Sequence, residues 1–197
     1  MTLRFLVLAT IIALSAALPV RADPFEDGKI AYGRADYGAA LAYWRPLAER
    51  GHDGAQLFLG HMYENGNGVP QSYAEALKWY RKSADAGNPG AQTNTGAIYA
   101  TGQGARQDYA EAIKWYRRAA EQGFAPGQIN LASMYANGKG VAKDNVQALK
   151  WYSIAAGPAK AGVAANLRDA TAKDMTATQI AEAQRQAAAF MPKKEKP

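Results

Sequence analysis

The sequence contains no cysteine, and its histidines number only two, His52 and His61. The absence of cysteine excludes a disulfide framework, a thiolate metal site and a lipid-attachment thiol. A zinc site needs three or four ligands, and two histidines are too few. A histidine that acts as general base needs a nucleophile and an orienting acid near it, and the sequence shows no such set. We therefore expect no metal, no cofactor and no catalytic residue.

Long hydrophobic runs are also scarce, and the one present stands at the N-terminus. Arg4 precedes an uncharged apolar run from Phe5 to Leu18, and a small residue, Ala22, closes a cleavage-like site. This pattern predicts a signal peptide over residues 1–22. A bilayer-spanning helix needs about 20 apolar residues, so a retained anchor is the weaker interpretation. We expect a periplasmic or secreted protein, with a eukaryotic secretory lumen as the alternative.

Strong net charge is missing as well. Removal of residues 1–22 takes away Arg4 and Arg21 and leaves 21 basic against 17 acidic residues, a net charge of +4. A nucleic-acid-binding protein would cluster more basic charge and place aromatic residues on the same exposed face. The aromatic residues here stand at positions that the pattern below predicts as buried. Nucleic acid is therefore not an expected partner.

What the sequence does have is a period of 36 residues, first seen in Trp79, Trp115 and Trp151. A period of this length indicates stacked helix pairs in which no unit can bury its apolar face alone. The fold class that it predicts is an all-α solenoid of antiparallel helix pairs, with the tryptophans in the core. The same period relates Tyr63, Tyr99 and Tyr135; Gly66, Gly102 and Gly138; Gly68, Gly104 and Gly140; and Ala76, Ala112 and Ala148.

Each unit contains the signals for two helices. Ala55, Leu59 and Met62 share one face of a first helix, which Gly66 ends. The second helix begins with a cap residue followed three positions later by Glu or Gln, which is the pattern of a capping box. The three boxes are Ser72 with Glu75, Asp108 with Glu111, and Asp144 with Gln147.

These residues, written as AQ..LG.MY..G.GV followed by YAEALKWYRKSA..G, resemble the Sel-one-like (Sel1) repeat family, a branch of the tetratricopeptide-type α-solenoids. Three repeats are expected over residues 52–158, preceded by a degenerate leading repeat over 23–51 that lacks the glycine loop. Capping helices are expected over 159–191, with a capping box at Thr176 and Gln179. A disordered basic tail is expected over 192–197. In the third repeat Ala132 replaces Gly60 and Gly96, which predicts looser stacking there.

Solenoids of this type line their concave side with first helices, so the residues off the core stripe there are the candidate contact surface. They differ between units whose scaffold positions match, which is typical of a recognition surface and equally of a neutral solvated one. We call them the first-helix strip: Leu57, His61, Glu64, Thr93, Ala97, Ala100, Ile129, Ser133 and Ala136.

A second candidate surface is basic. Six side chains beside the tryptophans on the second helices are expected to form a solvated outer face, with an anionic polymer as the alternative ligand. They are Lys78, Arg81, Lys82, Lys114, Arg117 and Arg118.

The resemblance implies a non-enzymatic adaptor or regulator that binds a protein or peptide through the concave face. Association with a membrane-bound envelope complex is among the roles that it implies. One alternative is a structural envelope protein that binds an anionic polysaccharide through the basic face. The other is a hydrolase, since a cysteine-rich branch of the family is linked to β-lactam hydrolysis; that branch is held by disulfides, and this chain has no cysteine.

Overall fold

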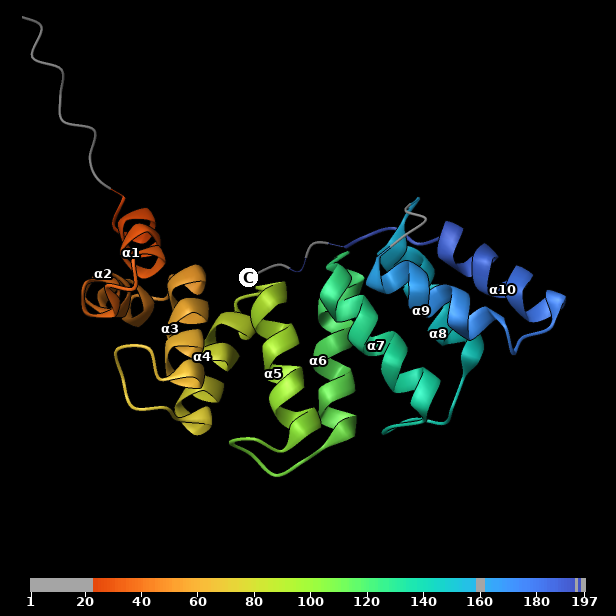
Figure 1. Cartoon of the computed structure of the whole chain (residues 1–197), viewed down its shortest axis with the longest axis horizontal. Coiled ribbons are helices and arrows are strands. Elements are labelled where there is room, and N and C mark those ends of the chain that lie inside the picture. The colour runs from red at the N-terminus through yellow and green to blue at the C-terminus, as the bar shows by residue number, and fades with distance from the viewer. Residues whose placement is uncertain (1–22, 159–161, 194, 196–197) are drawn as a thin grey trace, which may run out of the picture.

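The computed structural model describes residues 23–158, 162–193 and 195, and all regular structure within these ranges is helical. The predicted signal peptide lies outside the described residues. Consecutive helices form antiparallel pairs that stack side by side along one axis, which confirms the all-α solenoid (Figure 1). The helices are α1 Pro24–Gly33, α2 Tyr37–Glu49, α3 Asp53–Asn65, α4 Tyr73–Asp85, α5 Pro89–Thr101, α6 Tyr109–Glu121, α7 Ala125–Asn137, α8 Asn145–Ala156, α9 Val163–Ala172 and α10 Ala177–Ala188.

The second helices are capped at their N-termini, but by half of the predicted box. Ser72 Oγ accepts a hydrogen bond from the Glu75 amide at 3.2 Å, as expected. The reciprocal bond from the Ser72 amide to Glu75 is replaced by one to the carbonyl of Tyr63, at 2.8 Å. The first helix of the same pair thus satisfies that amide and frees the Glu75 side chain to pair with Lys78. Asp108 and Asp144 repeat this arrangement, donating to Tyr99 and Tyr135, and the complete box is at Thr176 and Gln179.

The glycine loops join each unit to the one before it. Gly104 has φ +83°, and a Cβ added there would stand 2.5 Å from the carbonyl carbon of Tyr73, at the start of α4. Only glycine fits so close to another backbone in this conformation. Gly68 and Gly140 lie in the same way against Tyr37 and Tyr109. Each loop is therefore seated on the second helix of the preceding pair.

A buried glutamine makes a second tie between units. The amide of Gln92, near the start of α5, donates to the carbonyl of Ala84, near the end of α4, at 3.1 Å. The Ala84 carbonyl also accepts from the Gly87 amide at 3.0 Å, so the Gln92 bond is an additional contact that ties α4 to the next helix. Gln56 and Gln128 do the same for Ala48 and Ala120.

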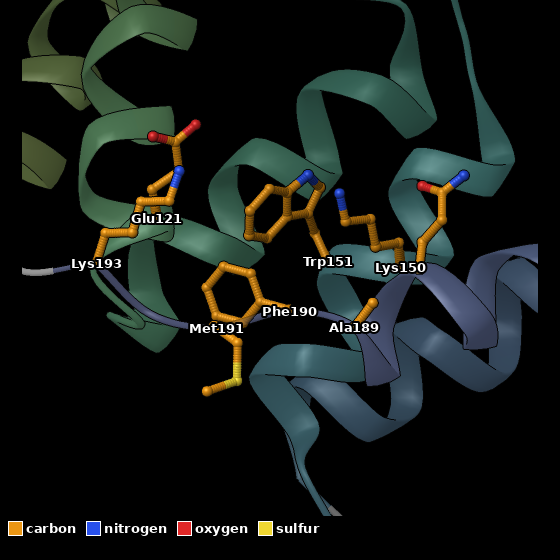
Figure 2. Close-up of a pocket in the computed structure, with 8 residues that line it drawn as sticks. Glu121, Lys150, Trp151, Ala189, Phe190, Met191 and Lys193 are labelled. Carbon is orange, nitrogen blue, oxygen red and sulfur yellow. The ribbon is translucent and has the colours of Figure 1, made fainter.

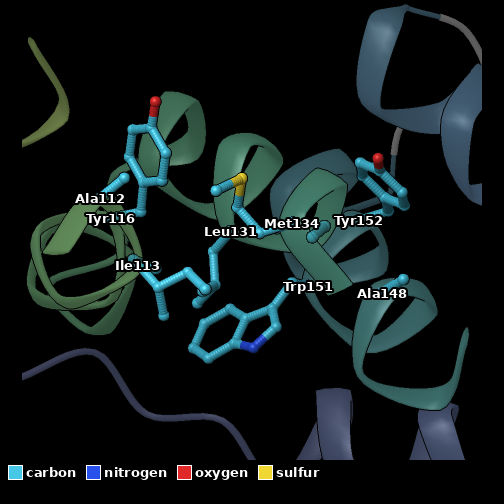
Figure 3. Close-up of a cluster of buried hydrophobic side chains, with 10 residues drawn as sticks. Ala112, Ile113, Tyr116, Leu131, Met134, Ala148, Trp151 and Tyr152 are labelled. Atoms are coloured by element: carbon cyan, nitrogen blue, oxygen red, sulfur yellow. The ribbon is translucent and has the colours of Figure 1, made fainter. Parts of the chain in front are cut away.

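The core runs along the array between the helix layers. Ile113 from α6, Leu131 from α7 and Trp151 from α8 point into one shared space (Figure 3). Trp115 and Trp151 are 5% and 6% exposed, as the sequence predicts. Trp79 differs, because it is only half-buried and its ring is covered by the ammonium group of Lys82 at 4.1 Å.

Another tryptophan, Trp44 of α2, is fully buried in the leading unit. Its indole nitrogen donates to the carbonyl of Phe25 in α1 at 3.1 Å, and its ring stacks on Phe58 of α3 at 4.4 Å. The leading unit lacks the glycine loop, so α1 passes to α2 through a short turn that includes Ala35 at φ +58°.

The C-terminal part covers the last repeat. Helices α9 and α10 both pack against α8 (Figure 1). Of the tail for which the sequence predicts disorder, Pro192, Lys193 and Glu195 are described, and they contact α6 and α5 instead of leaving the surface. Residues 194, 196 and 197 lie outside the described residues. Among the described helices, none combines the length and apolar character needed to cross a bilayer.

Candidate partner-binding face

The first-helix strip lies on α3, α5 and α7, and its members differ in how much of each a partner can reach. Thr93 is 7% exposed and donates its hydroxyl to the Pro89 carbonyl at 2.9 Å, so it offers little surface. Leu57, Ala100, Ile129 and Ala136 are half-buried and pack against the core clusters. Ala97 is half-buried and has no polar side-chain group. The polar side chains of the strip that a partner can reach are therefore those of His61, Glu64 and Ser133.

The polar members at the α3 end belong to one hydrogen-bonded group, which we call the His61 cluster: His61, Glu64, Tyr80 and Asn94. The hydroxyl of Tyr80, from α4, lies 2.9 Å from Nδ1 of His61 and donates to Oε2 of Glu64 at 2.5 Å. The side-chain amide of Asn94, from α5, stands 3.4 Å from the other ring nitrogen of His61. Three helices thus fix the imidazole from both sides.

Hydrogen bonding within the cluster sets its charges. The neighbouring His61 ring, whose Nδ1 lies 3.7 Å from Oε2 of Glu64, lowers the pKa of Glu64 below its usual value against the opposing effect of burial, and the hydrogen bond from Tyr80 lowers it further. Burial and the Glu64 carboxylate raise the pKa of Tyr80. At neutral pH the cluster therefore presents a carboxylate, and the Glu64 side chain keeps a third of its surface exposed.

Tyr80 is the first of three tyrosines that bring a hydroxyl to the strip. Tyr152 of α8 has its hydroxyl 2.8 Å from Oγ of Ser133. Tyr116 of α6 is the third, and the equivalent strip residue is Ala97, which has no polar group to offer. Burial raises the pKa of Tyr116 to about 12.

The sequence analysis did not identify Tyr80 as the residue whose hydroxyl supports His61. The available signal was the 36-residue period of Tyr80, Tyr116 and Tyr152 beside a variable strip residue. Asn94 carried no such signal, because its contact with His61 joins two different repeats.

The basic outer face is less free than the sequence suggests. Lys78 and Lys114 form ion pairs with Glu75 and Glu111 one turn away on their own helices. Arg117 donates to the hydroxyl of Tyr135, Lys82 lies over Trp79, and Arg118 is paired with two carboxylates. Among these six basic residues of the described structure, Arg81 is exposed and makes none of these contacts. These pairings weaken the case for a site that binds an anionic polymer.

The described residues also contain no group of three or more His, Asp or Glu placed to hold a metal ion. In the His61 cluster the polar groups are bonded to one another, an arrangement suited to recognition through hydrogen bonds.

Comparisons with known proteins agree with this architecture. A sequence model described as the Sel1 repeat matches four stretches, residues 25–52, 54–88, 89–124 and 125–156. The first stretch covers most of the leading unit. Among curated proteins, no match was found.

Two solved structures resemble the chain in fold and sequence. One is a Sel1 repeat protein from Oxalobacter formigenes, with 33% identity, 67% of this chain and 54% of that chain covered, and a TM-score of 0.64. The other is c5321, a protective antigen of uropathogenic Escherichia coli strains that displays an SLR fold. Its sequence is 28% identical over a match that covers 87% of this chain and 45% of that chain, and the TM-score is 0.61.

The chain spans about half the length of each of these two proteins. The four matched repeats extend over most of the chain, and the stacked pairs, glycine loops and capped second helices recur in each full unit. The chain belongs to the Sel1 repeat family.

Proposed function

We propose that this protein is an exported, non-enzymatic adaptor that binds a segment of a partner protein across the first-helix strip, with the His61 cluster as its polar anchor. Sel1 repeat proteins generally mediate protein–protein interactions, and the matched repeats support that class for this chain. The specific face and the anchor are our proposal.

The observation that carries the proposal is the contrast between equivalent positions of the strip. His61 and Glu64 form a fixed, part-exposed polar group, whereas their equivalents in the next unit are Ala97 and Ala100. Grooves that take a helix or an extended segment combine a few hydrogen-bonding anchors with room for the partner's backbone. The alanines give that room, and the preformed cluster lowers the ordering cost of binding.

The charge of the anchor indicates the chemistry of the contact. Glu64 is held as a carboxylate by His61 and Tyr80, so it suits a hydrogen-bond donor: a backbone amide, or a lysine or arginine side chain. We therefore expect a partner segment that places a donor opposite Glu64 and small or apolar side chains over α5.

The test is in-cell crosslinking of the tagged chain at native abundance, read by mass spectrometry, with two variants. Glu64→Gln keeps the size of the side chain and removes its charge, and Glu49→Gln makes the same change at an exposed position of α2. A partner captured by wild type and by Glu49→Gln, but depleted about tenfold with Glu64→Gln, is the expected result. Equal capture by all three chains would contradict the assigned anchor.

Export is a separate part of the proposal and is supported by the sequence of residues 1–22. The intact mass of the protein from fractionated cells tests it, since cleavage after Ala22 leaves a chain that begins at Asp23. Recovery of the uncleaved chain from the cytoplasm would contradict export.

A further inference from the structure

The described part of the C-terminal segment, residues 190–193 and 195, runs back over the array along the side on which successive repeats are joined (Figure 1). Phe190 meets the ring of Trp151 edge-on at 5.4 Å, and Figure 2 shows the chain continuing past Met191 toward Lys193 and Glu121. The amide of Lys193 donates to the carbonyl of Glu121, the last residue of α6, at 2.8 Å. The segment therefore occupies an extended path across the ends of α8 and α6.

The path ends where Glu195 enters a set of donors, which we call the Arg118 site: Arg118, Gln122 and Gln92. Nε of Arg118 lies 2.7 Å from one carboxylate oxygen of Glu195. The amide nitrogen of Gln122 lies 3.3 Å from the other oxygen, to which Gln92 also donates. A guanidinium with two amide donors is a strong arrangement for binding a carboxylate.

The donors of the Arg118 site are held in place by other contacts. Arg118 lies over the ring of Trp115 at 4.6 Å and also donates to the Ala84 carbonyl at 3.1 Å. Gln92 is fully buried, and its oxygen accepts from Gln122 at 2.8 Å. The site is thus built by α4, α5 and α6 without the tail.

The Arg118 site does not follow the repeat. Lys82 and Ala86 stand at the positions of Arg118 and Gln122 one unit earlier, and Ile154 and Pro158 stand there one unit later. A contact needed only to stack the repeats would recur with them, as the bond from Gln92 to Ala84 does. The combination of arginine and glutamine at this one junction indicates a ligand.

At the other end of the path the rings of Phe190 and Trp151 line a cavity of about 330 Å³, which we call the Trp151 cavity. Its remaining walls include Glu121 and Lys150 from the repeats and Met191 and Lys193 from the C-terminal segment itself. Met191 is 76% exposed. Arg118 and Glu195 each keep about a third of their side-chain surface exposed, so solvent and a competing carboxylate can reach the pair. The tail is held by few contacts and is suited to displacement.

We propose that the Trp151 cavity and the Arg118 site form one peptide-binding groove that takes an extended segment with an aromatic residue followed five positions later by a carboxylate. The chain's own C-terminal segment occupies this groove in competition with such a segment of a partner protein. A tether supplies an effective concentration in the mM range, so weak contacts keep the groove filled until a better-fitting segment arrives. This groove shares no residue with the first-helix strip, so the two proposals stand or fall separately.

The test is a fluorescence anisotropy titration with a labelled synthetic peptide of residues 188–197, added to the full-length mature chain. The chains are wild type, a released variant with Phe190→Ala and Glu195→Gln, and the released variant with Arg118→Gln added. Glu49→Gln is the charge-matched control. We expect the released variant to bind the peptide about tenfold more tightly than wild type or the control, because its groove is open. Adding Arg118→Gln should reverse this gain.

The Arg118→Gln variant could lose binding simply because it misfolds. A second peptide, with glutamine in place of Glu195, avoids this problem because the change is made in the peptide and the protein keeps Arg118. We expect it to bind the released variant at least about tenfold more weakly than the first peptide. Equal affinity for the two peptides would overturn carboxylate recognition, and equal affinity of wild type and released chain would overturn competition by the tail. A wild-type dimer that Glu195→Gln converts to a monomer would assign the tail to a second copy and overturn occupancy within one chain.

Discussion

Gly60 of α3 lies so close to Tyr80 of α4 that a Cβ at position 60 would stand 2.3 Å from the tyrosine ring. The absence of a side chain at this position therefore lets the ring cross α3 and carry its hydroxyl to His61 and Glu64. The polar anchor of the strip depends on a glycine that does not itself contact a partner.

Gly60→Ala should accordingly destabilise the protein by about 1–3 kcal/mol, because the added methyl forces Tyr80 out of its position in a packed core. Chemical denaturation at neutral pH measures the change. Gly38→Ala is the matched control: position 38 is exposed in α2, a Cβ there meets only Oδ1 of Asp36 at 3.8 Å, and the change should stabilise by up to about 1 kcal/mol. An equal loss in both variants would show that helix geometry, and not the Tyr80 ring, constrains position 60.

Trp44 and Trp79 are tryptophans of second helices with different surroundings, so their truncation should differ. Trp44→Ala removes a fully buried ring and its bond to the Phe25 carbonyl, and should cost about 3–5 kcal/mol. Trp79→Ala should cost clearly less, since Trp79 is only half-buried: it packs at the edge of the leading unit's core, and Lys82 covers its ring. Urea denaturation of the two variants compares them directly, and a larger loss at Trp79 would contradict the deeper burial of Trp44.

Gln56 leaves its buried Oε1 without a hydrogen-bond partner, whereas Oε1 of Gln92 accepts from Gln122. The residue equivalent to Gln122 is Ala86, which has nearly the same backbone angles at the end of its helix. Ala86→Gln should therefore supply the missing donor and raise the free energy of unfolding by about 1 kcal/mol. Ala86→Met, similar in length but without an amide, should not do so. A thermal melt in which both variants gain equally would assign the effect to packing alone.

The lowered pKa of Glu64 makes part of the stability depend on pH. A carboxyl whose pKa falls on folding stabilises the folded chain above its unfolded pKa, and this contribution is lost as the pH falls through the folded value. The stability difference between wild type and Glu64→Gln should be full near neutral pH and should shrink as the pH drops below the ordinary value of 4.5. Urea titrations at several pH values measure it, and a difference that grows on acidification would contradict the assigned direction.

Much of the fold could be read from the sequence because the signals are local and recur three times. Ser72 predicts the start of α4, and Gly66 predicts the end of α3, as the structure shows. The half-formed capping boxes were not predictable in this way. The amide of Ser72 is taken by the carbonyl of Tyr63, nine residues away on another helix, and no local pattern encodes that contact.

The candidate site was predictable as a face but not as a cluster. The period located His61 and Glu64 on the exposed side of a first helix, but Tyr80 and Asn94 reach them from α4 and α5. The tail was missed for a related reason. Its charge and prolines suggest disorder, and the side chains that receive Glu195 lie 73 to 103 residues away in sequence.

The seats of the glycine loops on the preceding second helices have a consequence for the length of the array. Gly68, Gly104 and Gly140 meet Tyr37, Tyr73 and Tyr109 through the same kind of close backbone contact, so every junction uses one interchangeable seam. A whole 36-residue unit inserted at a junction carries its own loop glycine and its own tyrosine at the start of the second helix. Growth or shrinkage by complete units therefore preserves the contact at each junction. One residue inserted into the loop between Gly66 and Asn67 would instead bring Asn67 to the seat against Tyr37, where a side chain does not fit. Duplication by whole repeats is therefore the change in length that keeps these contacts intact.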